Sequence, residues 1–503
     1  MSGKLNMEPR SSSQELHHEI FGSILDRVEM TPYLLLSADN YQTALRQATK
    51  MMSNRGFDSV GNGELQESEQ ERAKTYVYRT YNYFFNWMFP FVKKQLEGLL
   101  ALNSGNAELY QNCLQAIGRV EAILNESGFQ DIANQDPRHL FLLASSRKYP
   151  MVFAGYQGKN REVPLEWQQT ACSMLKMGYL IKSIEEESQD INDYAQLGFF
   201  LETENQSLDD LFNYNWENPQ HIPASESAQN AFVKISSFFH KLKESITFDD
   251  QQNGFVFDSG DGVRVNITEI KARLKSPESM VTKLGKDLEG EAYDIRDILA
   301  ITFILKDRDD TLKLFHALQK KGVILQENTN SQSITQTLFD DPESMIEAVR
   351  RLMVSLSQSA GYEKTSTEQE LLANAKTFYE ALSMNAAKNQ HSSLGHRKFQ
   401  CKISFSLPIH RDAATHKIMI PGTPIYAQRN QIDKKTQEHT LGVELRISDE
   451  ESWRTSEQTG DSHHDAYKFR QLISVMNRVL KNVFYLPKES ITQLKKDQLT
   501  LFS

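Results

Sequence analysis

Apolar residues recur every three or four positions through most of the first half of the chain, most clearly at 109–124 and 167–184. A period near 3.6 residues is typical of helices that bury one face. The pattern therefore predicts an all-α domain over residues 16–245. It is preceded by a polar, serine-rich tail at 1–15, which we expect to be flexible.

The pattern changes near residue 250, where alternating apolar positions replace the helical period. Apolar runs at 255–257 and 263–267 flank a turn rich in glycine and aspartate, an arrangement typical of a β-hairpin. Residues 298–305 form an unbroken apolar run, as expected for a central strand buried on both faces. Strands with one apolar face are predicted at 398–407 and 439–447.

Helices are predicted between these strands. The second hairpin strand keeps its period of two to about Lys275, and Ser276-Pro277-Glu278 then starts a helix to about Leu288 with Ser276 as N-cap. Further helical patterns lie at about 310–321, 342–357, 367–385 and 465–482.

The expected fold class is α+β: an all-α N-terminal region followed by a mixed-sheet domain at 250–485. Four or five strands are expected in that sheet. Two of the helical patterns lie in an insertion at 327–390, and residues 486–503 are expected to be a C-terminal tail.

Charge and composition restrict the partners. The formal net charge is −10, so an anion site must be a local basic region on an acidic protein. Three widely spaced cysteines suit a reducing compartment, and the N-terminus lacks the apolar segment of a signal peptide. The most apolar stretch, 83–92, is much shorter than the ~20 residues of a membrane span. We therefore expect a cytoplasmic protein without a membrane partner.

Aromatic residues are dense between 76 and 92. The simplest interpretation of such a cluster is a buried core. The alternative is an interface, through which the N-terminal helical domain would bind a protein partner or a second copy of the chain.

Basic and hydroxyl side chains meet where the hairpin ends. Arg273 and Lys275 are two positions apart on a predicted strand, so they share a face that leads into a helix N-terminus carrying Ser276 and Ser279. Cations beside a helix N-terminus favour anions, which predicts a polyphosphate cradle. The alternative is a solvated strand face with a good helix cap.

Two carboxylates are candidates for metal and proton chemistry. Asp297 lies at the mouth of the buried strand, where a carboxylate can hold Mg²⁺ beside substrate phosphates. Glu444 alternates with Val443 and Leu445, so it faces away from the buried side chains and could complete the metal site or act as a general base. An acidic strand end without function is the alternative for Asp297.

A basic region surrounds these positions. Residues 388–446 contain ten Lys or Arg and four Asp or Glu. Arg397, Lys398 and Arg446 belong to this local excess of positive charge, which is expected to attract anionic ligands.

Four ordered segments resemble the motif series of RelA/SpoT-type (p)ppGpp synthetase domains. They are Arg273–Ser279, the strand that starts at Asp297, Gly395–Gln400 and Val443–Ser448. The resemblance covers roughly residues 250–485 and implies a nucleotidyltransferase-type fold.

The resemblance also implies Mg²⁺-dependent transfer of pyrophosphate from ATP to the 3′-hydroxyl of a guanine nucleotide, the chemistry of guanosine tetraphosphate in the stringent response. Arg273 would stack on adenine, and Lys275 and Ser279 would contact the ATP phosphates. Asp297 would bind Mg²⁺, while Glu444 would complete the metal site or activate the acceptor hydroxyl.

The chain departs from the family pattern at several positions. His396 takes the place of a tyrosine that stacks on the acceptor base. Thr302 replaces an arginine that contacts adenine, and Gln400, Arg446 and Ser448 replace a histidine, a glutamine and an arginine. These changes affect the donor and acceptor more than the expected metal ligands.

The first hypothesis is therefore a nucleotide pyrophosphokinase, with a guanine nucleotide or the 3′ end of a tRNA as acceptor. A second is a catalytically degenerate sensor that binds nucleotide in a remnant site and signals through its helical half. Thr302 and Gln400 favour the sensor, whereas Asp297 with Glu444 disfavours it. A third is a helical scaffold in which the motif matches are chance.

Overall fold

The computed structural model describes residues 34–36, 41–60, 64–102, 105–130, 136–145, 151–153, 161–187, 189–204, 223–250, 254–286, 297–325, 334–358, 373, 375–377, 379–380, 397–412, 418–419, 434–458, 463–481 and 483–502. The chain forms two compact units that interleave along the sequence. Unit 1 comprises 1–186, 281–290 and 468–501, and unit 2 comprises 187–280, 291–467 and 502–503. The predicted tail at 1–15 lies outside the described residues.

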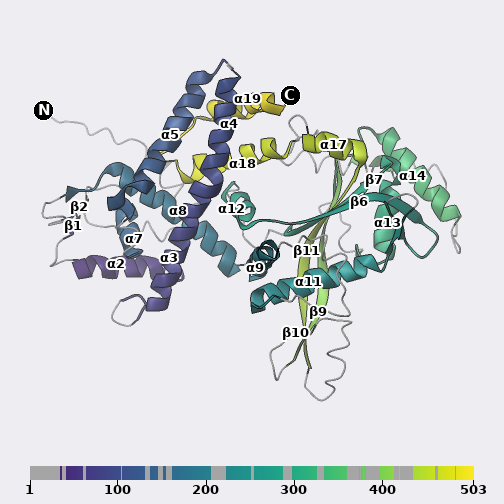
Figure 1. Ribbon diagram of the computed structural model, residues 1–503, viewed down its shortest axis with the longest axis horizontal. Helices are drawn as coiled ribbons and strands as arrows, with labels where there is room; N and C mark the ends of the chain where they lie inside the picture. Colours follow the sequence, from purple (N-terminus) through teal and green to yellow (C-terminus); the bar gives the residue numbers. More distant parts are fainter. Residues whose placement is uncertain are drawn as a thin grey trace. The chain divides into compact units, whose positions relative to one another are not determined.

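Unit 1 is mainly helical (Figure 1). Its helices include α2 (Tyr41–Ser53), α3 (Glu67–Asn82), α4 (Phe89–Ala101), α5 (Ala107–Asn125), α7 (Arg138–Ser145), α8 (Leu165–Glu187) and α19 (Lys488–Asp497). Helix α18 (His464–Val479) belongs to unit 1 from Lys468 onward, while its first turn, with Tyr467, belongs to unit 2. Helix α2 packs against α7, and α4 packs against α5. The periodic stretches at 109–124 and 167–184 lie in α5 and α8, so both helix predictions are confirmed.

A π-helix, η2 (Tyr83–Met88), joins α3 to α4 at the aromatic segment. Pro90 follows the π-helix. Proline has no N–H to donate to the carbonyl four positions earlier, and its ring crowds that carbonyl, so a wider π turn fits the chain before Pro90. Tyr83, Phe84 and Phe89 are at most 3% exposed, and the rings of Phe84 and Phe89 stack with centroids 5.5 Å apart. The prediction of a buried core is confirmed for these residues.

Two expectations for the ends of the sequence need correction. The N-terminal region is not all-α, because the short strands β1 (Leu34–Leu36), β2 (Met151–Phe153) and β3 (Arg161–Glu162) form a small sheet. Strands of two or three residues are too short to show a period of two. The predicted C-terminal tail contains α19 and the 3-10 helix η9 (Gln498–Phe502), and Leu494 of α19 is fully buried.

Unit 2 is organised by a mixed sheet. Its strands are β4 (Ile246–Asp249), β5 (Gly254–Asp258), β6 (Arg264–Leu274), β7 (Leu299–Leu305), β8 (Ile334–Gln336), β9 (Phe399–Asp412), β10 (Ile418–Met419) and β11 (Lys434–Asp449). The order is β10-β9-β11-β7-β6-β5-β4, and β8 pairs with the start of β9. Only the β11–β7 pair is parallel among the described pairs of this sheet, so the expected mixed sheet is confirmed.

The strands predicted at the hairpin, at 298–305, at 398–407 and at 439–447 are confirmed by β5, β6, β7, β9 and β11. The expected total of four or five strands is wrong, because the described sheet also contains β4, β8 and β10. These extra strands have at most four residues and carry little periodic signal.

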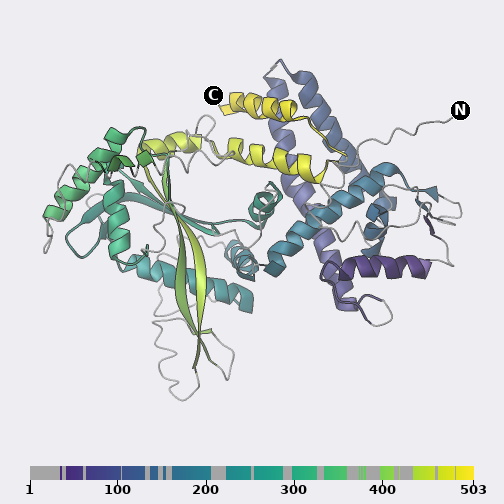
Figure 2. The same ribbon diagram turned by 180° about the vertical axis from the view of Figure 1, so that it is seen from behind.

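The helices of unit 2 include α9 (Gln189–Thr203), α11 (Glu226–Lys243), α13 (Thr311–Lys320), α14 (Pro342–Ser357) and α17 (Glu450–Gln458). Of these, α11, α13 and α17 contact strands of the sheet, while α9 packs on α11 and α14 on α13. Figures 1 and 2 show α11 crossing the long strands β9 and β11, with which it is in contact. Phe315 of α13 packs edge-on against Phe399 of β9, so α13 covers the apolar face of the sheet. None of the described helices combines the length and apolarity needed to span a membrane.

Several helix boundaries agree with the sequence. Helix α12 (Pro277–Lys286) follows β6 as predicted, and the Ser279 amide donates to Ser276 Oγ at 3.3 Å, which confirms Ser276 as the N-cap. Gly322 closes α13 with a φ of 66°, a conformation that favours glycine. Helix α14 matches the first helical pattern of the insertion, while much of the second pattern lies outside the described residues.

Candidate functional site

One row of side chains crosses the centre of the sheet. Arg273 of β6 pairs with Ala300 of β7, which pairs with Glu444 of β11, which in turn pairs with Lys402 of β9. Paired residues on neighbouring strands point to the same face. Arg273, Glu444 and Lys402 therefore share a face, and the small Ala300 lies between the first two.

A second row lies two positions further along each strand. Lys271 pairs with Thr302, which pairs with Arg446, which pairs with Gln400. Because a shift of two residues keeps the same face, the two rows together form a polar surface on the central strands. We call the six charged or amide residues of these rows the polar sheet face: Lys271, Arg273, Gln400, Lys402, Glu444 and Arg446. The opposite face carries the apolar positions between them, such as Ala272, Ile301 and Leu445.

Glu444 is the most enclosed charge of the polar sheet face, at 3% exposed. Its Oε2 accepts a hydrogen bond from Gln400 Nε2 at 2.8 Å, and its Oε1 accepts one from Arg446 Nε at 2.6 Å. Burial by itself would raise the pKa of Glu444, but attraction to Arg446 and Lys398 outweighs it and lowers the pKa to about 2. The carboxylate is therefore held in its ionised form.

Asp297 and Lys275 form an ion pair just beyond the ends of β7 and β6. A backbone hydrogen bond holds the two chain segments together here, since the Lys275 amide donates to the carbonyl of Ile298, the residue after Asp297, at 2.8 Å. The negative charge of Asp297 also acts to raise the pKa of Glu444 and of Tyr467. The two predicted carboxylates thus act on one another electrostatically in a single neighbourhood.

Lys398 and Tyr467 border the polar sheet face. Part of Lys398 is exposed, but protein surrounds its ammonium, and this desolvation together with repulsion from Arg446 lowers its pKa to about 7. Burial raises the pKa of the Tyr467 hydroxyl to about 12, and the two nearby carboxylates add to the effect. The Arg273 side chain is exposed to solvent. Its pKa is nevertheless lowered, mainly by partial desolvation of the guanidinium and also by repulsion from Arg446.

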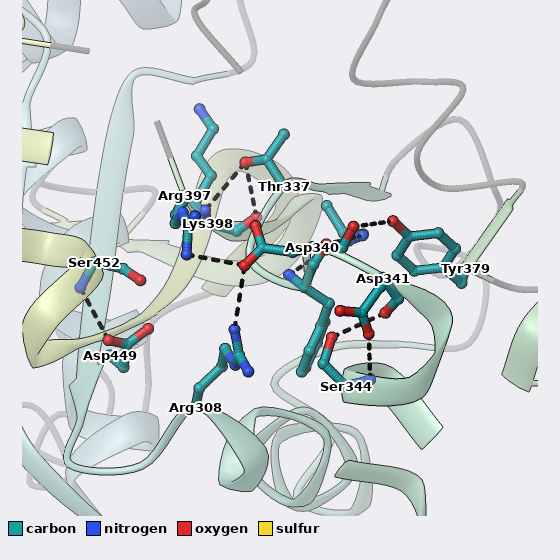
Figure 3. A network of polar contacts seen from close by, with 12 residues as sticks. Arg308, Thr337, Asp340, Asp341, Ser344, Tyr379, Arg397, Lys398, Asp449 and Ser452 are labelled. Atoms are coloured by element: carbon teal, nitrogen blue, oxygen red, sulfur yellow. Dashed lines mark hydrogen bonds and ion pairs between the residues drawn. The ribbon is translucent and has the colours of Figure 1, made fainter. Parts of the chain in front are cut away.

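The insertion holds the start of β9 in place (Figure 3). The Thr337 amide donates to the Lys398 carbonyl at 2.8 Å, and the Lys398 amide donates to Thr337 Oγ1 at 3.1 Å. Asp340 lies between Arg397, at 3.0 Å, and Arg308, at 3.7 Å. Insertion residues after β8 thereby fix the backbone from which Lys398 extends.

The structure brings some of the predicted site residues together and separates others from them. Arg273, Lys275, Asp297, Lys398, Glu444 and Arg446 come together, as the electrostatic interactions above show. Arg397 pairs with Asp340 instead of with this group. The Ser276 and Ser279 hydroxyl oxygens are 3.1 Å apart, with Ser276 capping α12. The predicted acceptor-stacking residue, His396, lies outside the described residues.

Gln400 and Tyr467 were not among the predicted site residues. Gln400 is 6% exposed, and its Oε1 is buried without a hydrogen-bond partner in the described part of the chain. The period of two from Lys398 to Lys402 would have placed Gln400 on this face. Tyr467 is in α18, outside the strands, and no local sequence pattern relates it to the sheet.

The donor set is compatible with Mg²⁺. Over the described ranges, no group of three or more His, Cys, Asp or Glu side chains is arranged to hold a metal ion. Mg²⁺, however, usually takes one or two carboxylates and completes its shell with substrate phosphates and water. Asp297 and Glu444 supply two such oxygen donors, so they fit an ion that arrives with a nucleotide better than an ion held by protein alone.

No protein-family model matches this chain, and no curated protein or solved structure matches it either. The chemistry of the site therefore has to be argued from its own charges and contacts.

Proposed function

We propose that the polar sheet face, with Lys275, Asp297 and Lys398, binds a nucleoside polyphosphate together with Mg²⁺. The observation that supports this proposal most directly is Glu444, a buried carboxylate held ionised among cations. A buried charge cluster of mixed sign is costly to maintain for stability alone, and perturbed groups of this kind gather at functional sites.

The proposed reaction is transfer of pyrophosphate from ATP to the 3′-hydroxyl of a guanine nucleotide, as the resemblance to RelA/SpoT-type domains implies. The acceptor oxygen attacks the β-phosphorus of ATP, the bond from that phosphorus to the bridging α–β oxygen breaks, and AMP leaves. The acceptor proton passes to a base. Lys398, with its pKa lowered to about 7, suits that role better than Glu444, with a pKa of about 2.

The remaining side chains would bind and orient the nucleotides. Arg273, exposed on the polar sheet face, would stack on adenine, and Lys275 with Ser279 would contact phosphates. Asp297 and Glu444 would hold Mg²⁺, which would neutralise the developing phosphate charge. The cations Lys275 and Arg446, now paired with these carboxylates, would then bind the phosphates instead.

A nucleotide sensor without turnover is the second candidate. It is favoured by Thr302, which stands on the second row of the polar sheet face where the family has an arginine, and by the carboxylate of Glu444, both of whose oxygens are already hydrogen-bonded. In this case the nucleotide would bind but no pyrophosphate would move.

The deciding experiment is incubation of the full chain with γ-³²P-ATP and Mg²⁺, offering GDP, GTP or bulk tRNA in separate reactions. Label should appear on a guanine nucleotide or on tRNA, which would also identify the acceptor. The pair of changes Asp297→Asn and Glu444→Gln should abolish the product. The control Glu347→Gln, on the exposed surface of α14, should leave it unchanged. ATP binding with no labelled product would support the sensor, and no nucleotide binding at all would refute both proposals.

A further inference from the structure

Helix α17 stands at one end of the polar sheet face. Strand β11 ends at Asp449, and α17 begins at the next position and contacts both β7 and β11. Figure 1 shows the helix at this end of β11. In the row beyond the second one, Ile304 pairs with Ser448, and each of these side chains is only 2% exposed. The open part of the polar sheet face therefore stops at its second row, beside α17.

Trp453 reaches from α17 to the polar sheet face. The centre of its ring lies 5.3 Å from the ammonium of Lys271, which stands in the second row, paired with Thr302. Trp453 is half-buried, whereas Lys271 and Arg273 are both exposed. An aromatic ring thus borders the same surface that carries the cations proposed to bind a nucleotide.

A flat base suits this ring better than the lysine that now lies against it. A cation–π contact at an exposed site favours association only about two- to fivefold, whereas stacking of a base on an aromatic side chain favours it about fivefold to more than a hundredfold. A base can therefore displace the Lys271 ammonium, which still has Glu269 at 3.3 Å as a partner. Arg273 lies two positions further along β6, about 6.6 Å away, so one flat ring fits between the two rows.

We propose that Trp453 stacks on the base of the nucleotide bound at the polar sheet face. The inference rests on the function proposed above and adds to it a residue that binds the base. The phosphates lie towards Lys275 and Asp297, beyond the ends of β6 and β7, and the base lies towards α17. Trp453 is a binding residue in this arrangement and takes no part in the transfer of pyrophosphate.

The first test is calorimetric titration of the full chain, in Mg²⁺, with ATP and with tripolyphosphate, which has no base. Trp453→Leu should weaken ATP binding about tenfold and leave tripolyphosphate binding unchanged, because only the stacking is lost. Trp453→Phe keeps an aromatic face and should bind ATP within about threefold of the unaltered chain.

Trp87→Leu is the matched control. Trp87 is in η2 of unit 1 and also lies against a lysine, with the Lys468 ammonium 4.3 Å from its ring centre. This variant should bind ATP and tripolyphosphate like the unaltered chain. A loss of ATP affinity as large as that of Trp453→Leu would show that removal of any such ring disturbs binding, which would contradict the inference.

Tryptophan fluorescence gives a second readout that a merely structural role would not produce. The chain has four tryptophans, and stacking on adenine should quench the emission of Trp453. ATP should therefore quench the unaltered chain more than tripolyphosphate does. Trp453→Phe should lose this extra quench although it still binds ATP.

The outcomes separate this inference from the proposed function. If the unaltered chain binds ATP and Trp453→Leu binds it equally well, the base lies elsewhere and only this inference is wrong. Equal weakening of ATP and tripolyphosphate would mean that Trp453 supports the fold and does not bind the base. No ATP binding by the unaltered chain would refute both. Circular dichroism checks folding, and if Trp453→Leu does not fold, an extra quench that persists in Trp453→Phe would still overturn the inference.

Discussion

Thr337 and Lys398 are hydrogen-bonded to each other across 61 positions of the sequence: the Thr337 amide donates to the Lys398 carbonyl, and the Thr337 side-chain hydroxyl accepts from the Lys398 amide. The first of these residues belongs to the insertion and the second borders the polar sheet face. A segment that interrupts the strand sequence therefore helps to position a side chain of the candidate site.

The hydroxyl of Thr337 should protect the Lys398 amide. Thr337→Val removes the acceptor and leaves this amide without its partner, at a local cost of about 1 kcal/mol. Hydrogen exchange at the Lys398 amide should then become about fivefold faster, as measured by mass spectrometry of peptides from this segment. Thr337→Ser keeps the oxygen and should exchange like the unaltered chain; equal protection in the valine variant would contradict the prediction.

Removing the charge of Glu444 should destabilise unit 2. Glu444→Gln removes the buried negative charge that balances the cations Arg446 and Lys398. Breaking a buried ion pair in this way lowers the free energy of unfolding by about 3 kcal/mol. Urea unfolding measures the change. Glu269→Gln is the matched control, because the Glu269–Lys271 pair is exposed and worth less than about 1 kcal/mol. Similar losses in the two variants would mean that Glu444 is not the enclosed charge described above.

The stability of unit 2 should depend on acid through Glu444. Its folded pKa of about 2 lies below the ordinary value of 4.5, so the stability it contributes is complete above pH 4.5 and is lost as the pH falls towards 2. Urea unfolding should be measured at several pH values in this range. The free energy of unfolding should fall more steeply with decreasing pH for the unaltered chain than for Glu444→Gln. Parallel curves for the two proteins would argue against a lowered pKa.

Lys398 should react as an amine near neutral pH. With a pKa of about 7 in place of 10.5, its labelling by acetic anhydride should reach half its maximum near pH 7, well below the midpoint of a lysine with the ordinary pKa. Glu444→Gln removes an attraction that raises the pKa of Lys398, so the labelling midpoint should fall further. A midpoint near pH 10.5 would show that Lys398 is an ordinary surface amine.

The aromatic segment offers a test of core against interface. Phe84 is fully buried, so Phe84→Ala should cost about 3–5 kcal/mol in urea unfolding. Tyr78 is 66% exposed, so Tyr78→Ala should change stability by less than about 0.5 kcal/mol. Light scattering of the same variants tests the predicted self-association: a loss of mass in Tyr78→Ala with unchanged folding would support an interface at this surface.

The sequence by itself determined the elements whose signal is local. The apolar run of β7, the alternation in β6, β9 and β11, and the cap formed by Ser276 all follow from neighbouring residues, and these elements agree with the structure. Short strands such as β8 were missed, because three residues have no measurable period and form a strand only when a partner supplies the hydrogen bonds.

The tertiary structure alone decided which polar groups meet. Alternation along β6 and β11 predicts faces for Arg273 and Glu444, but only the register of both strands on β7 places them on either side of Ala300. Likewise, the sequence marks Arg397 and Lys398 as two similar cations. In the structure, Arg397 pairs with Asp340, whereas burial beside Arg446 lowers the pKa of Lys398. The sequence could not predict this difference, because strand pairing brings these residues together from distant parts of the chain.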